Sequence, residues 1–384
     1  MAFSPALATF LSSQAAPIPI QTPSTVAELA RLLKECQGQK VLPLGQGSKW
    51  GWAPRLEAVD LILSTRGLCR LIDHAAADLT ATVEAGMTLA ELQAILAERG
   101  QWWPVDPLYP DWATVGGVIA TADTGSLRWR YGSIGDLVLG ITWVRADGEV
   151  AKAGGRVVKN VAGYNLTRLF AGSLGSLGIL TQVTLRLYPL PAAQATLLAA
   201  GALPDLETLA RQVLSAPVSP VGVDLWLGAG GSQLWIHFHG SERGIAHQMT
   251  QVQQLAPAGL SWQEARPGAL PLPSPRLGMV LAKFGCLPSQ SLATLEQFQS
   301  LFPNAQVQLH RGCGLGRAWI PQAERGSLLQ LQRYLQAAGG FLVLLEAPAD
   351  LKTALAPDFG PTATLMHRLK QQFDPAGIFS PRFL

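Results

Sequence analysis

Three short segments of the chain combine glycine with hydroxyl side chains, a composition suited to binding phosphate. They read GQGSK at 45–49, ATVGG at 113–117 and GSLGSLG at 172–178. Glycine lets the backbone approach a ligand that any Cβ would block, and successive backbone N–H groups form hollows that bind anions. We therefore expect the three segments to surround a single extended dinucleotide, which requires their glycines to line one site.

The first of these segments is not diagnostic alone. A Rossmann fingerprint would need a third glycine at a fixed spacing and a helix that opens directly after the loop, and 45–49 offers neither. A Walker loop would need a GK[ST] sequence after the glycines, which is also missing. By itself, the segment also fits a tight turn.

The second segment lies inside a longer stretch, 106–132, that is rich in small residues and poor in charge. Trp112, Val115, Val118 and Ile119 need burial, which argues against a flexible linker, while the small residues offer too little apolar bulk for a core. One interpretation is a pocket wall that turns backbone N–H groups and hydroxyls toward a large, flat, phosphorylated ligand. The alternative is a set of tight turns between strands.

Side chains able to exchange protons or bind anions occur in the second half of the chain. His237 and His239 share one face of a predicted strand, which suits a base or a metal pair, but no third ligand of suitable spacing follows. Surface or core histidines are the simpler interpretation, and no metal site is predicted. His310, Arg311 and Arg317 lie in HRGCGLGRAW, where glycines allow close approach and an arginine fork suits a carboxylate. The alternative is a loop with solvated arginines.

The composition describes a folded chain with little charge. Of 384 residues, 48% are hydrophobic and 14% are charged, with 11 tryptophans, so we expect two or three domains and a buried surface for a partner. The net charge of +3, without a lysine or arginine cluster, argues against nucleic acid as a ligand. Four cysteines without a CxxC pair fit free thiols in a reducing cytosol.

Neither a secretory nor a membrane segment is predicted. The first 20 residues lack the basic region of a signal peptide. The longest run of small apolar residues, 192–203, is interrupted by polar residues and is too short to span a membrane. We therefore expect a cytoplasmic protein.

The first 190 residues follow an α+β pattern rather than regular βαβ winding. Capping boxes at Thr25…Glu28 and Thr88…Glu91 each begin a predicted helix. Strands are predicted at 40–44, 60–64, 68–73, 80–84, 136–145, 150–152 and 179–188, with a helical turn at 165–170.

From residue 192 onward, strands and helices alternate. Strands are predicted at 221–227, 233–239, 277–284, 305–310, 318–320 and 340–345, and helices at 206–214, 242–255, 289–302 and 328–338. Two αβ halves on one antiparallel sheet fit this order best. A helix at 362–373 and an apolar tail follow. The predicted domains are 1–190, split near 100–110, and 191–348, with 349–384 returning to the first domain.

Several motifs together carry a family resemblance. Segments 43–48, 83–86, 113–117, 130–132, 172–180 and 373–381 resemble the FAD-binding domain of the vanillyl-alcohol-oxidase (PCMH) type. VKNVAGYNL at 158–166, with the short second domain, is similar to the FAD-binding E subunit of glycolate oxidase. The resemblance covers nearly the whole chain and is weakest in the second domain. It implies an α+β fold, with a two-subdomain FAD-binding domain and a smaller α+β cap domain built on an antiparallel sheet.

The resemblance also implies roles for individual residues. The pyrophosphate would be held by Gly45, Gly47 and Ser48, with Lys49 beside them. The flavin and ribityl path would be lined by Thr114, Gly116, Gly117, Thr121, Gly125 and Ser126. Ile179 would offer its backbone to the cofactor. Lys159 and Asn160 fit either a structural turn or a contact with flavin or a partner. Relatives often have Asn where this chain has Ala122, so one hydrogen bond is expected to be missing. Because neither the first glycine loop nor 106–132 contains His or Cys, we expect non-covalent FAD.

The function implied by the resemblance is that of an FAD-binding subunit in a glycolate oxidase-like complex. It would help to oxidise a 2-hydroxy acid, such as glycolate to glyoxylate, and pass electrons to a second FAD subunit and an iron–sulfur subunit. Larger catalytic relatives carry an HxGDGN-type segment that is missing here, which favours a relay or scaffold role over dehydrogenation. Membrane association would come only through partners. The alternatives are a stand-alone FAD-dependent dehydrogenase of D-lactate or glycolate, and a flavin-free scaffold subunit.

Overall fold

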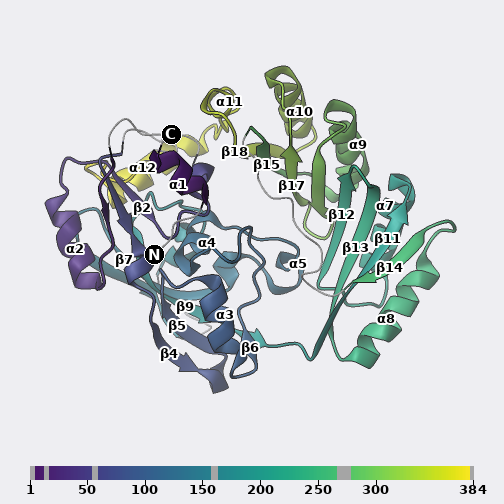
Figure 1. The fold of residues 1–384 in the computed structure, drawn as a ribbon, viewed down its shortest axis with the longest axis horizontal. Coiled ribbons are helices and arrows are strands. Elements are labelled where there is room, and N and C mark those ends of the chain that lie inside the picture. The colour runs from purple at the N-terminus through teal and green to yellow at the C-terminus, as the bar shows by residue number, and fades with distance from the viewer. Residues whose placement is uncertain (1–4, 13–16, 54–58, 157–162, 266–277, 381–384) are drawn as a thin grey trace. The chain divides into compact units, whose positions relative to one another are not determined.

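The computed structural model describes residues 5–12, 17–53, 59–156, 163–265 and 278–380 (Figure 1). Within it, the chain forms two compact units. Unit 1 comprises Met1–Gly125, Gly132–Leu190 and Asp358–Leu384, and unit 2 comprises Ser126–Tyr131 and Pro191–Pro357. Lys159 and Asn160 lie outside the described residues. The assignment of these units as a FAD domain and a cap domain stays a prediction.

Unit 1 combines helices with a parallel and an antiparallel sheet, so the predicted α+β fold is confirmed. The parallel sheet has the order β1 (Ile20–Gln21), β3 (Leu61–Ser64), β2 (Val41–Leu44). The antiparallel sheet has the order β4 (Leu71–Ala75), β5 (Thr80–Glu84), β9 (Ile179–Arg186), β7 (Val138–Val144), β8 (Val150–Gly154), and β6 (Gln101–Trp102) pairs with β10 (Tyr188–Pro189). Each larger sheet has its own apolar core. Further helices of this unit are α1 (Pro5–Ser12) and α6 (Leu166–Phe170).

The two predicted capping boxes differ in outcome. Helix α3 (Leu89–Ala97) has the complete box, in which Thr88 accepts from the Glu91 backbone and Glu91 accepts from the Thr88 backbone. Helix α2 (Val26–Glu35) has only half of it, because the Glu28 carboxylate accepts from the Ser24 N–H at 2.8 Å instead. The prediction of the helix was right, and the predicted reciprocal bond was wrong.

The glycine-rich stretch 106–132 contains a helix where the turn interpretation expected none. Helix α4 (Val115–Thr121) begins after Thr114, whose side chain accepts a hydrogen bond from the Gly117 N–H at 3.2 Å. A Cβ on Gly116 would lie 2.9 Å from the Ala85 Cβ, so only glycine lets this helix pack so closely. The short helix α5 (Arg128–Tyr131) follows and belongs to unit 2.

Unit 2 is built on one eight-stranded antiparallel sheet. Its strands are β11 (Ala193–Gly201), β12 (Gly222–Gly228), β13 (Gly231–Gly240), β14 (Ser261–Ala265), β15 (Val280–Gly285), β16 (Gln306–His310), β17 (Leu315–Ile320) and β18 (Phe341–Glu346). Their order in the sheet is β14-β11-β13-β12-β16-β17-β15-β18. Each half of the sheet contains four strands that follow one another in the chain, β11–β14 and β15–β18. From the sheet edge inward, both halves run in the order fourth, first, third and second strand. The predicted pair of αβ halves is therefore confirmed.

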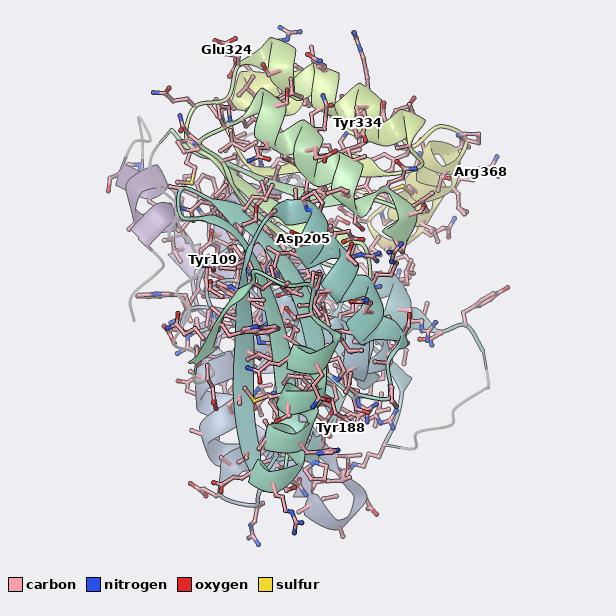
Figure 2. All side chains as sticks on the ribbon, turned by 90° about the vertical axis from the view of Figure 1, so that its right-hand side faces the viewer. Tyr109, Tyr188, Asp205, Glu324, Tyr334 and Arg368 are labelled. Carbon is pink, nitrogen blue, oxygen red and sulfur yellow. The ribbon has the colours of Figure 1, made fainter. Side chains whose placement is uncertain are left out.

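Four long helices cover one face of this sheet, and the short helix α5 of the same unit lies against the other, called the α5 face here. The helices are α7 (Leu203–Ser215), α8 (Glu242–Leu255), α9 (Ser291–Leu301) and α10 (Arg325–Ala337), followed by α11 (Ala349–Ala354). Figure 2 views this unit from the helix side, with Asp205 on α7 and Tyr334 on α10 in front of the strands. Val223, Leu225 and Leu309 belong to the core under the helices. Alternation along the strands therefore places Asp224 and His310 on the α5 face.

The C-terminal segment of unit 1 lies against β2. After helix α12 (Thr362–Phe373), the Ile378 carbonyl accepts from the Val41 N–H at 2.9 Å, and the Ser380 N–H donates to the Val41 carbonyl at 2.9 Å. Lys370 on α12 donates to the Ser176 carbonyl at 2.8 Å. The tail thereby fixes the loop that contains the third glycine-rich segment.

Candidate functional site

The three glycine-rich segments line a single cavity of unit 1. About 820 Å³ of empty space, part of it open to solvent, lies between residues 42–53, 114–121 and 173–180, with Thr65 at its wall. Gly47, Gly117 and Gly175 all line it. The expected convergence of the three segments is therefore met.

Backbone conformations that favour glycine shape this cavity. Gly47 and Gly175 have φ values of +75° and +78°, a left-handed region that strains other residues. A Cβ on Gly45 would lie 2.1 Å from Thr114 Oγ1. Because Thr114 is the N-cap of α4, Gly45 lets the first loop sit directly against the second.

Polar groups along the cavity fit a polar, phosphorylated ligand such as FAD. The side-chain oxygens Gln46 Oε1 and Ser173 Oγ are buried and make no hydrogen bond to the described residues. A buried acceptor or hydroxyl without a partner costs about 1–3 kcal/mol, which a ligand hydrogen bond removes. Lys49 also lines the cavity, and its ammonium lies 3.3 Å from the Asp123 carboxylate, with both side chains almost wholly buried.

Most of the predicted cofactor residues lie at this cavity. Its lining includes Gly45, Gly47, Ser48, Lys49, Thr114, Gly116, Gly117, Thr121 and Ile179. Gly125 and Ser126 are not among the lining residues: the Gly125 N–H donates to Asp106 Oδ1 at 2.8 Å, and Ser126 belongs to unit 2.

Several lining residues lie outside the three segments that were predicted to surround the cofactor. They are Leu42, Pro43, Leu44, Trp50, Ala53, Thr65, Ala120 and Leu180. Those beside the glycine-rich segments could have been inferred from their neighbours. Thr65 carries no such signal, because the pairing of β2 with β3, rather than sequence proximity, brings it to the first loop.

A second polar site lies on the α5 face of unit 2. The fully buried Asp224 carboxylate accepts hydrogen bonds from the Ser126 hydroxyl and from Gln308 Nε2, the latter at 2.8 Å. His310 Nδ1 lies 2.9 Å from Asp224 Oδ1 and 3.2 Å from Ser126 Oγ. Burial alone would raise the pKa of Asp224, but the charge of His310 and hydrogen bonds from His237 and His310 hold it well below its usual range. Asp224 is therefore ionised at neutral pH and can only accept hydrogen bonds.

The two strand histidines proposed as a base or metal pair are both hydrogen-bonded. His237 Nδ1 lies 2.8 Å from Thr196 Oγ1, and His239 Nδ1 lies 3.1 Å from the Tyr131 hydroxyl. Burial, helped by the neighbouring His237, lowers the pKa of His239 to about 4, so it is neutral at physiological pH. Among the described residues, no group of three or more His, Cys, Asp or Glu side chains could hold a metal ion.

The two arginine candidates occupy different environments. Arg311 forms a bidentate ion pair with Glu207 on α7, with Nη2 at 2.8 Å from Oε1, which anchors the loop after β16. Arg317 on β17 is 4% exposed and lies on the α5 face, opposite Lys283 on one side and Gln308 on the other. Arg317 and Lys283 therefore place two cations side by side, an arrangement that suits an anion.

The comparisons with known proteins identify the family of the chain. A family model described as "FAD binding domain" matches residues 17–154. The glycolate oxidase subunit GlcE of Escherichia coli is 30% identical over 312 residues, which cover 81% of this chain and 83% of that protein. The chain belongs to the GlcE family. It binds FAD and is an FAD-dependent oxidoreductase.

Other similarities cover less of the relative or concern the fold alone. The glycolate oxidase subunit GlcD of Bacillus subtilis is 33% identical over 48% of this GlcE-family chain, which spans 40% of GlcD. A probable mitochondrial D-lactate dehydrogenase of Danio rerio is 31% identical over 61% of the chain, which spans 50% of that protein. A solved alkyldihydroxyacetonephosphate synthase has a TM-score of 0.74 at 16% identity, covering 96% of this chain and 77% of its own, and shares the fold. Across the described ranges, no helix is long and apolar enough to cross a membrane.

Proposed function

We propose that this chain is the FAD-binding subunit of a glycolate oxidase-like complex. It would oxidise a 2-hydroxy acid, glycolate to glyoxylate, and pass electrons to a second FAD subunit and an iron–sulfur subunit. The observation that carries the proposal is the match to 83% of the length of GlcE, a glycolate oxidase subunit. The further match to GlcD, another subunit named for glycolate oxidase, supports assembly into a complex.

The cofactor would be held by the glycine cavity of unit 1. Gly45, Gly47 and Ser48 would bind the pyrophosphate through backbone N–H groups and a hydroxyl. Thr114, Gly116, Gly117 and Thr121 would line the flavin and ribityl path, with Ile179 offering its backbone. FAD, when bound, supplies an acceptor for a hydride and thus for two electrons. None of the described residues that line the cavity is His or Cys, which supports non-covalent binding.

The acid would be recognised by cations on unit 2. Arg317 and Lys283 lie opposite each other on neighbouring strands of the α5 face. A guanidinium binds carboxylate in a fixed, bidentate geometry. We therefore assign the carboxylate contact to Arg317, with Lys283 beside it.

The alternatives make different predictions. A flavin-free scaffold is disfavoured, because the chain belongs to an FAD-binding family. A stand-alone dehydrogenase of D-lactate or glycolate would reduce an artificial acceptor rapidly without any partner. A complex subunit would need its partners for fast turnover, even where its own flavin is reduced by the acid.

One experiment separates these cases. The chain is purified alone and together with its native partners, and the flavin spectrum, partner identities and turnover of glycolate and D-lactate are measured. We expect yellow protein, release of all flavin on denaturation, and turnover that rises with co-purified flavin and iron–sulfur subunits. Flavin retained on the precipitate would exclude non-covalent binding. Rapid turnover by the isolated chain would exclude the need for a complex.

A further inference from the structure

A lysine in the last turn of helix α12 holds a backbone carbonyl of the third glycine-rich segment of unit 1. Lys370 Nζ donates to the Ser176 carbonyl at 2.8 Å. Ser176 directly follows Gly175, which lines the glycine cavity, while Lys370 itself is not among the lining residues. Its side chain is 23% exposed, so water competes little for this charged donor. Lys370 therefore acts on the cavity through the loop rather than by direct contact.

The same ammonium is bonded to the C-terminal tail, residues 374–380. It lies 2.5 Å from Asp374 Oδ2 and donates to the Phe379 carbonyl at 3.2 Å. The buried Asp374 carboxylate also accepts from the N–H groups of Ile378 and Phe379, at 2.8 and 2.9 Å. Without Lys370, this carboxylate would be a buried charge without its cation, which is strongly destabilising. The turn of the tail and the bond to Ser176 therefore depend on one side chain.

The tail is also paired with the strand that leads into the first glycine-rich segment. The Val41 N–H donates to the Ile378 carbonyl and the Ser380 N–H donates to the Val41 carbonyl, both at 2.9 Å. Val41 begins β2, which runs directly into segment 45–49. The tail is thus bonded to the strand before the first segment and, through Lys370, to the third segment.

The first and third walls of the cavity also touch each other. A Cβ on Gly175 would lie 2.8 Å from Pro43 Cγ on β2, so the third segment packs tightly against this strand. Pro43 and Gly175 both line the cavity. A displacement of the segment that Lys370 holds would therefore change the width of the cavity at this contact.

We propose that Lys370 is a positioning residue for FAD: by holding the Ser176 carbonyl it sets the third glycine-rich segment, and it thereby couples docking of the C-terminal tail to cofactor binding. The inference rests on the placement of FAD in the glycine cavity under the proposed function, and it requires nothing of the substrate. Such coupling is reciprocal. Whatever tail docking adds to the affinity for FAD, FAD binding adds to the stability of the docked tail.

The first test measures the Kd of FAD for the full-length apoprotein by fluorescence quenching. Lys370→Met keeps the apolar stem and removes the donor, and we expect its Kd to rise at least about tenfold. Lys370→Arg keeps a cation and its donors, so its Kd should stay within about threefold of wild type. Lys34→Met, which breaks only an exposed ion pair with Glu149, is the control and should match wild type. Normal affinity in Lys370→Met, or an equal loss in Lys370→Arg, would overturn the role of the Lys370 ammonium.

Gly45→Ala in the same assay tests the placement of FAD separately. If Gly45→Ala weakens FAD binding and Lys370→Met does not, the role of Lys370 falls and the cavity stands as the cofactor site. If neither substitution weakens binding, the placement of FAD in the glycine cavity falls, and the role of Lys370 with it.

A second measurement needs no variant, so it holds even where Lys370→Met fails to fold. Hydrogen exchange of the wild-type tail is followed with and without saturating FAD. The Ile378 and Phe379 N–H groups should exchange at least about tenfold more slowly with FAD, because their exchange requires the tail to open. Helix α8 of unit 2, which has its own apolar core, should exchange equally in both states. Exchange of the tail that FAD leaves unchanged would overturn the coupling.

Discussion

Lys49 and Asp123 form a buried ion pair, 3.3 Å apart, that joins the first glycine loop of unit 1 to the end of helix α4. Asp123 Oδ2 also accepts the Leu108 N–H at 2.7 Å. Lys49 was expected beside a pyrophosphate. Its positive charge, which would attract the pyrophosphate, is balanced by the Asp123 carboxylate. The pair thereby connects two walls of the cavity.

Breaking this ion pair from either side should destabilise unit 1. We expect Asp123→Asn and Lys49→Met each to lower the free energy of unfolding by about 3 kcal/mol, because each leaves a buried charge uncompensated. The double variant should lose clearly less than the sum, by at least about 1.5 kcal/mol. Urea denaturation of the FAD-free protein, followed by fluorescence, measures the coupling. Strictly additive losses would show that the two charges do not interact.

How much of this molecule the sequence predicts depends on whether a signal is local. The Thr88–Glu91 box and the apolar stripe of 242–255 depend on residues close in sequence, and both helices were predicted. The recurring order of strands and helices along unit 2 was predicted for the same reason. Helix α4 was not, because its two glycines have low helix propensity. The Thr114 cap and the close contact of Gly116 with Ala85 select the helix.

The polar sites illustrate what local patterns omit. His310 and Arg317 were candidates because they lie in one glycine-rich loop sequence. Asp224 was not, since a single aspartate in a predicted strand carries no signal of its own. Its partner His310 is 86 residues away in sequence, and only the pairing of β12 with β16 brings the two together. Such sites require knowledge of strand register.

The contact between Gly45 and Thr114 should control the affinity for FAD. In Gly45→Ala, the new Cβ would lie 2.1 Å from Thr114 Oγ1, so the loop or the cap of α4 must move. We expect the Kd of FAD to rise at least about tenfold, measured by fluorescence quenching on titration of the apoprotein. Gly155→Ala, where a Cβ has no neighbour within 4 Å, is the control and should bind FAD normally. Equal affinities would show that the cavity tolerates this displacement.

Ala122, which ends helix α4, adopts a left-handed conformation that suits Asn or Gly better than Ala. Its φ is +47°, which costs an alanine about 1 kcal/mol or more. Ala122→Gly should therefore raise the free energy of unfolding by roughly 0.5 kcal/mol, after the entropy of the unfolded glycine is subtracted. Ala246→Gly, at an exposed position within helix α8, should lower it by about 0.5–1 kcal/mol. The same sign for both substitutions in urea denaturation would contradict this account.

His239 should make the stability of unit 2 sensitive to pH. Burial, helped by His237, lowers its pKa from 6.5 to about 4, so the unfolded chain binds a proton that the folded chain does not. The stabilisation is complete above pH 6.5 and is lost as the pH falls toward 4. The shift corresponds to roughly 3 kcal/mol, which partial exposure reduces to on the order of 1–2 kcal/mol. His239→Gln keeps a group that can bond to Tyr131 but cannot titrate.

The measurement is therefore the free energy of unfolding at pH 7.5 and pH 5 for wild type, His239→Gln and His247→Asn. Buried carboxylates such as Asp224, whose pKa is also lowered, lower the free energy of unfolding on acidification by the same amount in all three proteins. The difference between the proteins in this loss therefore reports on His239. We expect His239→Gln to lose about 1 kcal/mol less than wild type on acidification, because part of the titration lies between these pH values. The exposed His247 should have no effect. Equal losses in wild type and His239→Gln would place the acid sensitivity elsewhere. Removal of a half-buried histidine that is neutral at pH 7.5 must remove its share of the proton uptake.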